Sequence, residues 1–145
     1  MIRAFSALWL DPQTADMPKT VINVSSTSGL HGQMGQINYS TAKSGILGLT
    51  KTVAAEYNVR CNAVAYGWMD TRLTKPPTDE KVMLAGQNIV TGIPANARKF
   101  RDTLDIPLGR SSTVSDATNV MLFLASPMSS YVTATCIERT GGRYM

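Results

Sequence analysis

The sequence predicts an α/β protein in which a parallel sheet is only partly present within 145 residues. Three short apolar runs rich in β-branched residues alternate with two segments of helical character. This order is typical of parallel strands joined by crossover helices. A sheet of three strands leaves apolar edges open to pairing with other chains, so we expect the chain to be part of a larger, doubly wound domain.

Composition and charge exclude several classes of protein. The chain is 43% hydrophobic and 17% charged, which is ordinary for a globular domain. Its net charge of +4 is spread along the sequence, so we expect no nucleic-acid partner. No run of eighteen apolar residues occurs, so we expect no membrane span. Cys61 and Cys136 lack companions at metal-ligand spacing, which favours no metal site, reduced thiols and a cytoplasmic location.

The amino-terminal residues predict a helix, a linker, a strand and a loop. Residues 1–19 begin with "MIRAFSALWL", a helix remnant, and continue into a turn-rich linker without a signal-peptide cleavage pattern. The run "TVINVSS", residues 20–26, predicts a buried strand. Residues 27–36, "TSGLHGQMGQ", have three glycines and no periodicity, so we expect a loop with no helix in it. For His31, with no cysteine or carboxylate beside it in the sequence, we expect substrate contact or simple exposure.

The middle of the chain predicts a helix and a second strand. The helix begins at Asn38 or Ser40 and runs to about Glu56. Gly45 and Gly48 weaken an isolated helix, which indicates close approach to another helix or sheet. A second strand is expected at "VRCNAVA", residues 59–65, before the turn at Gly67.

The carboxyl-terminal half predicts a long connection, a helix and a third strand. Residues 72–108 are expected to form a lid over a substrate, with helices near 80–86 and 95–103. Thr113 or Ser115 can cap a helix that runs to about Ala125, with Asp116 in its first turn. The third strand is expected at "YVTATCIER", residues 131–139.

Tyr39 and Lys43 form the most distinctive local pattern. Their spacing of four places them one above the other on the same face of a helix. A nearby ammonium favours the charged form of a phenol, which allows proton exchange near neutral pH. The pair by itself also fits a core-edge tyrosine beside a solvated lysine. Ser26 and Gly67 both follow strand ends, where active sites of open α/β sheets lie, and this coincidence favours a catalytic site.

Three segments resemble the carboxyl-terminal half of the short-chain dehydrogenase/reductase family, especially its 3-oxoacyl-acyl carrier protein reductase-like members. They are "NVSSTSGLHGQMGQINYSTAK", "RCNAVAYGWMDTRLT" and "IPLGRSSTVSDATNVMLFLASPMSSYVT". The resemblance implies a partial Rossmann-like fold and reduction of a carbonyl, such as a 3-oxoacyl thioester, to a secondary alcohol with NAD or NADP. It implies that Tyr39 is the general acid, that Ser26 polarises the substrate oxygen, and that Lys43 assists Tyr39 and holds the nicotinamide ribose. Tyr39, Lys43, Gly67 and Thr71 would contact the cofactor.

Alternation along a strand allows only one of Ser25 and Ser26 into the site, and the family's spacing favours Ser26. The chain departs from the family's pattern at Tyr66, where proline is usual, and at Ala134, where glycine is common. It is also shorter than usual between the helix and the second strand.

The family's Gly-rich pyrophosphate turn and the residue that selects NAD or NADP belong to its first βαβ units, which no segment here matches. We therefore expect residues 1–145 to be a carboxyl-terminal catalytic half that is inactive in isolation. A separate amino-terminal half and oligomerisation through the Tyr39 to Glu56 helix are the expected partners. The alternative is a truncated, non-catalytic fragment or pseudoenzyme.

Overall fold

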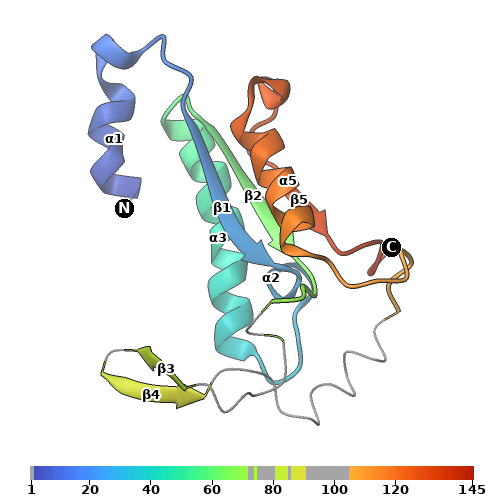
Figure 1. The fold of residues 1–145 in the computed structure, drawn as a ribbon. Coiled ribbons are helices and arrows are strands. Elements are labelled where there is room, and N and C mark those ends of the chain that lie inside the picture. Colours follow the sequence, from blue (N-terminus) through green and yellow to red (C-terminus); the bar gives the residue numbers. More distant parts are fainter. Residues whose placement is uncertain (1, 72–73, 75–80, 85, 91–104) are drawn as a thin grey trace. The chain divides into compact units, whose positions relative to one another are not determined.

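A computed structural model describes residues 2–71, 74, 81–84, 86–90 and 105–145 (Figure 1). The chain divides into two compact units. The first unit contains residues 1–67 and 118–139, and the second contains residues 68–117 and 140–145.

The first unit is built on a parallel sheet of three strands. These are β1 (Thr20–Ser26), β2 (Arg60–Tyr66) and β5 (Cys136–Arg139), in the order β1-β2-β5. The predicted alternation of strands and helices along the chain and the predicted fold class are confirmed. The third strand is shorter than predicted, because Ala134 adopts a φ of +58°, which lies outside the range of regular β-strands, and its N–H donates to Cys61 O.

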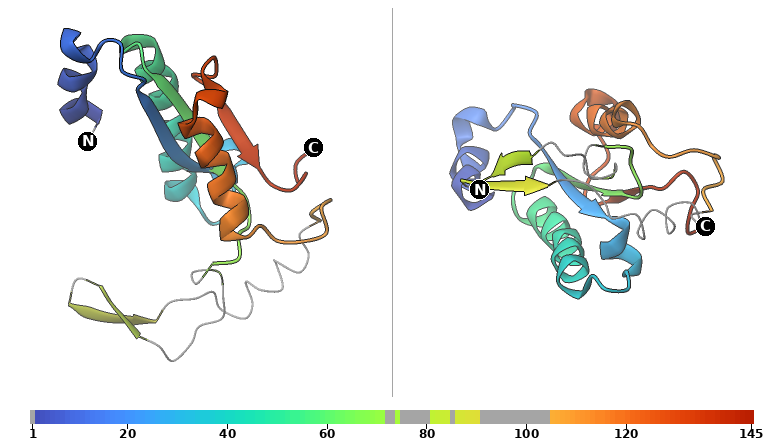
Figure 2. Two further views of the ribbon diagram at one scale, coloured as in Figure 1. Left: turned by 45° about the horizontal axis from the view of Figure 1, so that its top comes forward. Right: turned by 60° about the horizontal axis from the view of Figure 1, so that its bottom comes forward.

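Two long helices cover the sheet. Helix α3 (Ile37–Glu56) lies on one face, and residues 118–125 of helix α5 (Val114–Ala125) lie on the other, as Figure 2 shows. Helices on both faces of a parallel sheet define the doubly wound arrangement that the sequence predicts. Helix α3 begins one to three residues before the predicted start, after Gln36. It ends close to β2 because Asn58 takes a φ of +48° and turns the chain sharply.

A short helix, α2 (Thr27–His31), replaces the loop predicted directly after β1. The Ser26 side chain caps it by accepting the N–H of Ser28 at 3.2 Å. Five residues are too few to produce a helical hydrophobic period, so the prediction that this segment contains no helix was wrong. Packing against α3 stabilises this short helix.

Helix α1 (Ile2–Leu10) confirms the predicted amino-terminal helix and packs on the end of α3. The Trp9 ring meets Tyr57 edge-on at 5.6 Å between centroids, and Phe5 stacks on Trp9 at 6.2 Å. A 3-10 turn, η1 (Pro12–Thr14), follows within the predicted linker. Trp9 and Tyr57 pack against the buried side chains of Val53 and Cys61, which form the hydrophobic core at this end of the unit.

Arg60 joins β2 to the carboxyl end of α5. Its guanidinium donates to Leu124 O at 2.8 Å and to Ser129 Oγ at 2.7 Å, and Ser129 is fully buried in the 3-10 turn η2 (Pro127–Ser129). A cation at the last carbonyls of a helix satisfies acceptors that have no partner within the helix.

The second unit contains a hairpin of β3 (Lys81–Leu84) and β4 (Gln87–Val90), paired antiparallel. The helix predicted near 80–86 was therefore wrong. Gly86, at a φ of +80°, takes the left-handed conformation that tight hairpin turns require. The helix predicted at 95–103, like most of the expected lid, lies outside the described residues.

Thr113 and Asp116 begin α5 in this unit, as predicted. The Thr113 hydroxyl accepts the N–H of Asp116 at 3.1 Å, and the Asp116 carboxylate accepts the N–H of Thr113 at 2.9 Å. This reciprocal pattern is a capping box. Across the described helices of both units, none combines the length and apolar character needed to cross a bilayer.

Candidate functional site

The carboxyl ends of the three parallel strands meet at one edge of the sheet. Ser26, Tyr66 and Arg139 are the last residues of β1, β2 and β5, and they lie in register. Gly67 follows β2, and its N–H donates to Arg139 O at 2.9 Å. Ligand sites of open α/β sheets lie at this edge.

The two neighbouring serines make different contacts. Ser25 is buried, and its hydroxyl donates to the carbonyl of Lys43 at 2.8 Å, which fixes α3 on β1. Ser26 Oγ accepts the Ser28 N–H, and its own contact with Tyr66 O is long, at 3.5 Å. A hydrogen bond of that length is weak, so the Ser26 proton can turn to another acceptor. The opposite directions of the two side chains agree with strand alternation.

Helix α3 brings Tyr39 and Lys43 together, as their spacing predicts. The Lys43 ammonium lies 5.7 Å from the centroid of the Tyr39 ring. It also donates to Val24 O at 2.9 Å, two residues before Ser26 on β1. This bond ties the Tyr39–Lys43 pair to the strand that carries Ser26. Tyr39 is 46% exposed, so its phenol is accessible to a ligand.

Gly29 allows α2 to lie directly on α3. A Cβ built on Gly29 would stand 2.6 Å from the carbonyl carbon of Lys43 and 2.8 Å from the nitrogen of Ser44. Real side chains do not reach such distances, so only glycine fits there. Sequence reasoning missed this contact and assigned close approach to Gly45 and Gly48. Within the described chain, a Cβ at either of those glycines would meet open space.

The residue in the place of the expected proline, Tyr66, is buried in the sheet. Burial raises the pKa of the Tyr66 phenol, and the nearby Arg139 guanidinium offsets part of this effect. Tyr66 is thus a neutral core residue at physiological pH. Trp68, the other aromatic residue of this segment, is half-buried and belongs to the second unit.

Thr71 also belongs to the second unit, where it forms a tight turn with Thr74. Its N–H donates to Thr74 Oγ1 at 2.9 Å, and the Thr74 N–H donates back to Thr71 O at 3.0 Å. Ser26, Tyr39, Lys43 and Gly67 thus belong to the first unit, whereas Thr71 belongs to the second.

His31 is exposed, as expected, and it also contacts a carboxylate that is distant in the sequence. Its Nε2 lies 2.7 Å from Oε1 of Glu138 on β5. The two residues are 107 positions apart, so no local sequence pattern indicates their contact. Within the described ranges, no group of three or more histidine, cysteine or acidic side chains is placed to hold a metal ion.

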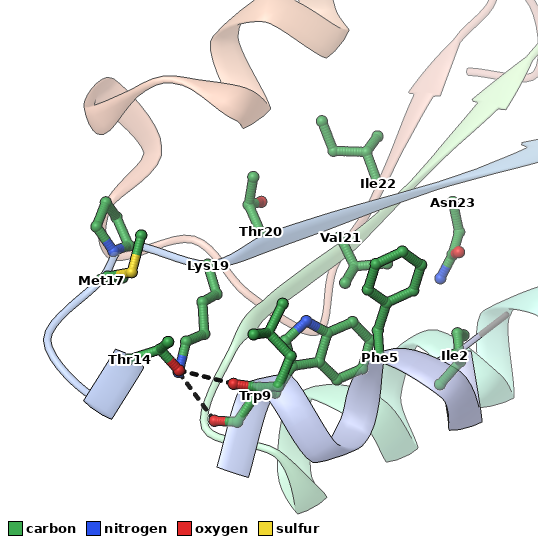
Figure 3. A pocket seen from close by; sticks show the side chains of 12 residues that line it. Ile2, Phe5, Trp9, Thr14, Met17, Lys19, Thr20, Val21, Ile22 and Asn23 are labelled. Atoms are coloured by element: carbon green, nitrogen blue, oxygen red, sulfur yellow. Dashed lines mark hydrogen bonds between the residues drawn. The ribbon is translucent and has the colours of Figure 1, made fainter. Parts of the chain in front are cut away.

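An apolar pocket of about 510 Å³ lies elsewhere in the first unit, between α1 and β1 (Figure 3). Phe5, Trp9, Val21 and Ile22 line it, and the Lys19 ammonium closes one side by donating to Trp9 O at 2.9 Å. The pocket reaches only as far along β1 as Asn23, so it does not include Ser26.

Comparison with known proteins gives a consistent set of relatives. A family model described as enoyl-(acyl carrier protein) reductase matches residues 12–143. A 3-oxoacyl-(acyl-carrier-protein) reductase of Aquifex aeolicus is 36% identical over 127 residues, which are 86% of this chain and 44% of the relative. The enzyme of the same name from Thermotoga maritima is 39% identical over 126 residues, 85% of this chain and 44% of the relative.

A human (3R)-3-hydroxyacyl-CoA dehydrogenase is 38% identical over 129 residues, which cover 87% of this chain and 43% of that enzyme. The chain thus spans less than half the length of each of these relatives.

Proposed function

The chain belongs to the short-chain dehydrogenase/reductase family, and from this membership we propose that Ser26, Tyr39 and Lys43 form the proton-donating site of a carbonyl reductase. One observation carries the proposal. The Tyr39–Lys43 pair on α3 is fastened to β1 by the bond from Lys43 to Val24 O, beside the strand end where Ser26 stands. A proton donor, a cation and a hydroxyl are thereby held by two adjoining elements.

In this proposal, Tyr39 gives its phenolic proton to the carbonyl oxygen of the substrate. The Lys43 ammonium stabilises the phenolate that is left, because a nearby cation favours the charged form. Ser26 donates a hydrogen bond to the same oxygen and so stabilises the negative charge that develops there. When bound, a reduced nicotinamide supplies the hydride to the carbonyl carbon, and the product is a secondary alcohol.

The cofactor is NAD or NADP, and Tyr39, Lys43, Gly67 and Thr71 would hold its nicotinamide end. The donor set fits this role, because an ammonium has three N–H donors and Val24 O takes one of them. The others suit the hydroxyls of a ribose. In this proposal, the 145 residues supply the carboxyl-terminal catalytic half of the enzyme. The turn that binds the cofactor pyrophosphate would belong to the amino-terminal half.

The proposed substrate is a 3-oxoacyl thioester or a similar small carbonyl compound. The relatives are named for 3-oxoacyl-carrier-protein, 3-hydroxyacyl-CoA and acetoacetyl-CoA chemistry, which supports this class. Residues 72–108 would act as the substrate lid, since they combine apolar side chains with several lysines and arginines that suit a phosphorylated carrier.

We further propose that α3 is an oligomer interface. The open space beside Gly45 and Gly48 would let another helix approach closely. The free thiols Cys61 and Cys136 fit a reducing, cytoplasmic compartment. The competing hypothesis is a non-catalytic fragment, in which the same residues persist without turnover.

A joined enzyme tests the proposal. The chain is fused behind the amino-terminal half of the Aquifex aeolicus relative, and reduction of acetoacetyl-CoA is followed with NADH and with NADPH. We expect turnover with at least one dinucleotide. A folded fusion that binds dinucleotide and reduces no 3-oxoacyl thioester would support the non-catalytic hypothesis.

Within that fusion, Ser26→Ala and Ser25→Ala form a matched pair. Ser26→Ala is expected to lower kcat by about tenfold or more, because the substrate oxygen loses a donor, and also to lower the unfolding midpoint, because α2 loses its N-cap. Ser25→Ala is expected to lower the unfolding midpoint without a comparable loss of kcat, because the Lys43 carbonyl loses its bond from Ser25. Equal effects of the two changes on kcat would contradict the assignment of Ser26.

A further inference from the structure

Helix α2 sets the position of Ser26, because the first turn of α2 binds the Ser26 side chain. Ser26 is the N-cap residue and accepts the N–H of Ser28. At the opposite end, His31 is the last residue of α2 and contacts Glu138. The His31 Nε2 lies 2.7 Å from Oε1 of Glu138, which is hydrogen-bond distance. The helix is therefore held at both ends.

The contact between His31 and Glu138 reaches across the sheet. Glu138 lies on β5, and β2 separates β5 from β1. Glu138 is in register with Ala65, which is in register with Ser25. Side chains in register on parallel strands share a face, and the Ser25 hydroxyl shows that this face is the one covered by α3. Glu138 thus connects α2 to β5, which β2 separates from β1.

The middle of α2 rests on a rigid contact. Gly29 touches the backbone of Lys43 and Ser44, and α3 cannot yield there without moving its own backbone. Gly29 would therefore act as a pivot for this helix of five residues, so that a change at the His31 end would tilt the capped end. The same contact adjoins Lys43, so α2 links the two parts of the proposed site.

We propose that His31 and Glu138 are positioning residues that hold Ser26 in place through α2. The inference rests on the proposed function of Ser26. Both side chains are about one-third exposed, at 34% and 31%, so their bond contributes little to overall stability. Its effect is on the orientation of the capped end of α2, where the Ser26 hydroxyl lies.

Hydrogen exchange at the Ser28 amide in the 145-residue chain tests the inference without requiring activity. This amide is the donor to Ser26 Oγ, so it reports the integrity of the cap. His31→Ala is expected to speed its exchange by about two- to fivefold, the effect of losing one polar contact between side chains that are about one-third exposed. Glu138→Ala should match this increase, and the double variant should add nothing, because both changes break the same bond.

Two further variants separate positioning from general loosening. His31→Gln keeps a side-chain N–H donor and is expected to restore slow exchange. Met34→Ala, at a 98% exposed position three residues further along, is expected to leave the Ser28 amide unchanged. Unaltered exchange in His31→Ala, or additive effects in the double variant, would overturn the inference.

Kinetics of the joined enzyme give an independent readout. His31→Ala should lower kcat with an unchanged KM for dinucleotide, since Ser26 acts on the substrate oxygen, and His31→Gln should recover most of the loss. An equal loss in both variants would contradict the positioning role. A joined enzyme without any turnover would instead refute the proposed function, and the exchange measurement would then decide the role of His31 by itself.

Discussion

Ala134 stands in the left-handed region of backbone space, with a φ of +58°. This conformation costs a residue with a Cβ about 1–2 kcal/mol, and glycine escapes most of that cost. The loop is kept in this form by neighbouring bonds, including those from the Ala134 N–H to Cys61 O and from the Ala63 N–H to Thr135 O, both 2.8 Å. The strain lies at the point where the chain enters β5.

Replacing Ala134 with glycine is therefore expected to stabilise the chain. The gain should be about 0.5–1 kcal/mol, because relief of strain exceeds the added entropy of the unfolded chain. Thermal unfolding at a fixed protein concentration measures it. Ala42→Gly, in an exposed position of α3, is the matched control and should lower the midpoint, since glycine weakens helices by about 1 kcal/mol. An unfolding midpoint of Ala134→Gly below that of the unchanged chain would contradict the backbone strain inferred at Ala134.

The contacts of single residues are predictable from the sequence when the partners are close along the chain. The contact of Tyr39 with Lys43 and the different directions of Ser25 and Ser26 follow from helical and strand spacing. The contacts of Gly29 and His31 do not, because their partners are brought close only by the folded sheet and helix. The local signal of the close approach was a glycine, Gly29, three residues after the end of β1.

Helices and strands, too, are predictable where their signal is local and are missed where it is not. The start of α5 is predictable, because Thr113 and Asp116 carry the capping box within four residues. Helix α2 and the hairpin of β3 and β4 were missed, since elements of four or five residues are too short for a reliable period. Elements of this length depend on packing more than on intrinsic propensity.

The start of α5 is expected to be sensitive to acid. A side-chain hydrogen bond from Arg110, followed by bonds from the backbone and hydroxyl of Thr113, holds the pKa of Asp116 far below its usual range. A carboxylate with a lowered folded-state pKa adds stability above its unfolded pKa of about 4 and loses it as the pH falls below that value. The thermal midpoint should therefore fall on acidification from about pH 4 downward.

The variant Asp116→Asn removes this ionisation and should reduce the slope of midpoint against pH in that range. The variant should be less stable than the unchanged chain at pH 7, and the two should converge as the pH falls. Parallel profiles from pH 7 to pH 2 would show that Asp116 does not carry the effect.

At the scale of the whole chain, β1 presents an open edge. Among the described strands it pairs only with β2, and the apolar pocket beside it is lined by exposed side chains of α1 (Figure 3). Phe5 is 49% and Leu8 is 51% exposed. Such a surface favours association with other chains, and a net charge of +4 opposes it weakly at physiological salt.

We expect the 145-residue chain to self-associate, with a mass above 15.7 kDa by size-exclusion chromatography and light scattering. Leu8→Glu, which puts a charge into the pocket surface, should shift the distribution toward monomer. Leu122→Glu, at a 70% exposed position of α5, is the matched control and should shift it less. A monodisperse monomer for the unchanged chain would show that the open edge needs no partner.

The central claim is that Tyr39 donates the proton, and a single substitution in the joined enzyme tests it most directly. Tyr39→Phe removes one hydroxyl and leaves the ring that the Lys43 ammonium contacts. Loss of a positioned proton donor lowers kcat by about a hundredfold to ten-thousandfold. Tyr131→Phe, at a fully exposed position, should leave turnover unchanged. We predict that kcat for acetoacetyl-CoA falls in this range in Tyr39→Phe alone, and turnover equal to that of the unchanged enzyme would contradict the account.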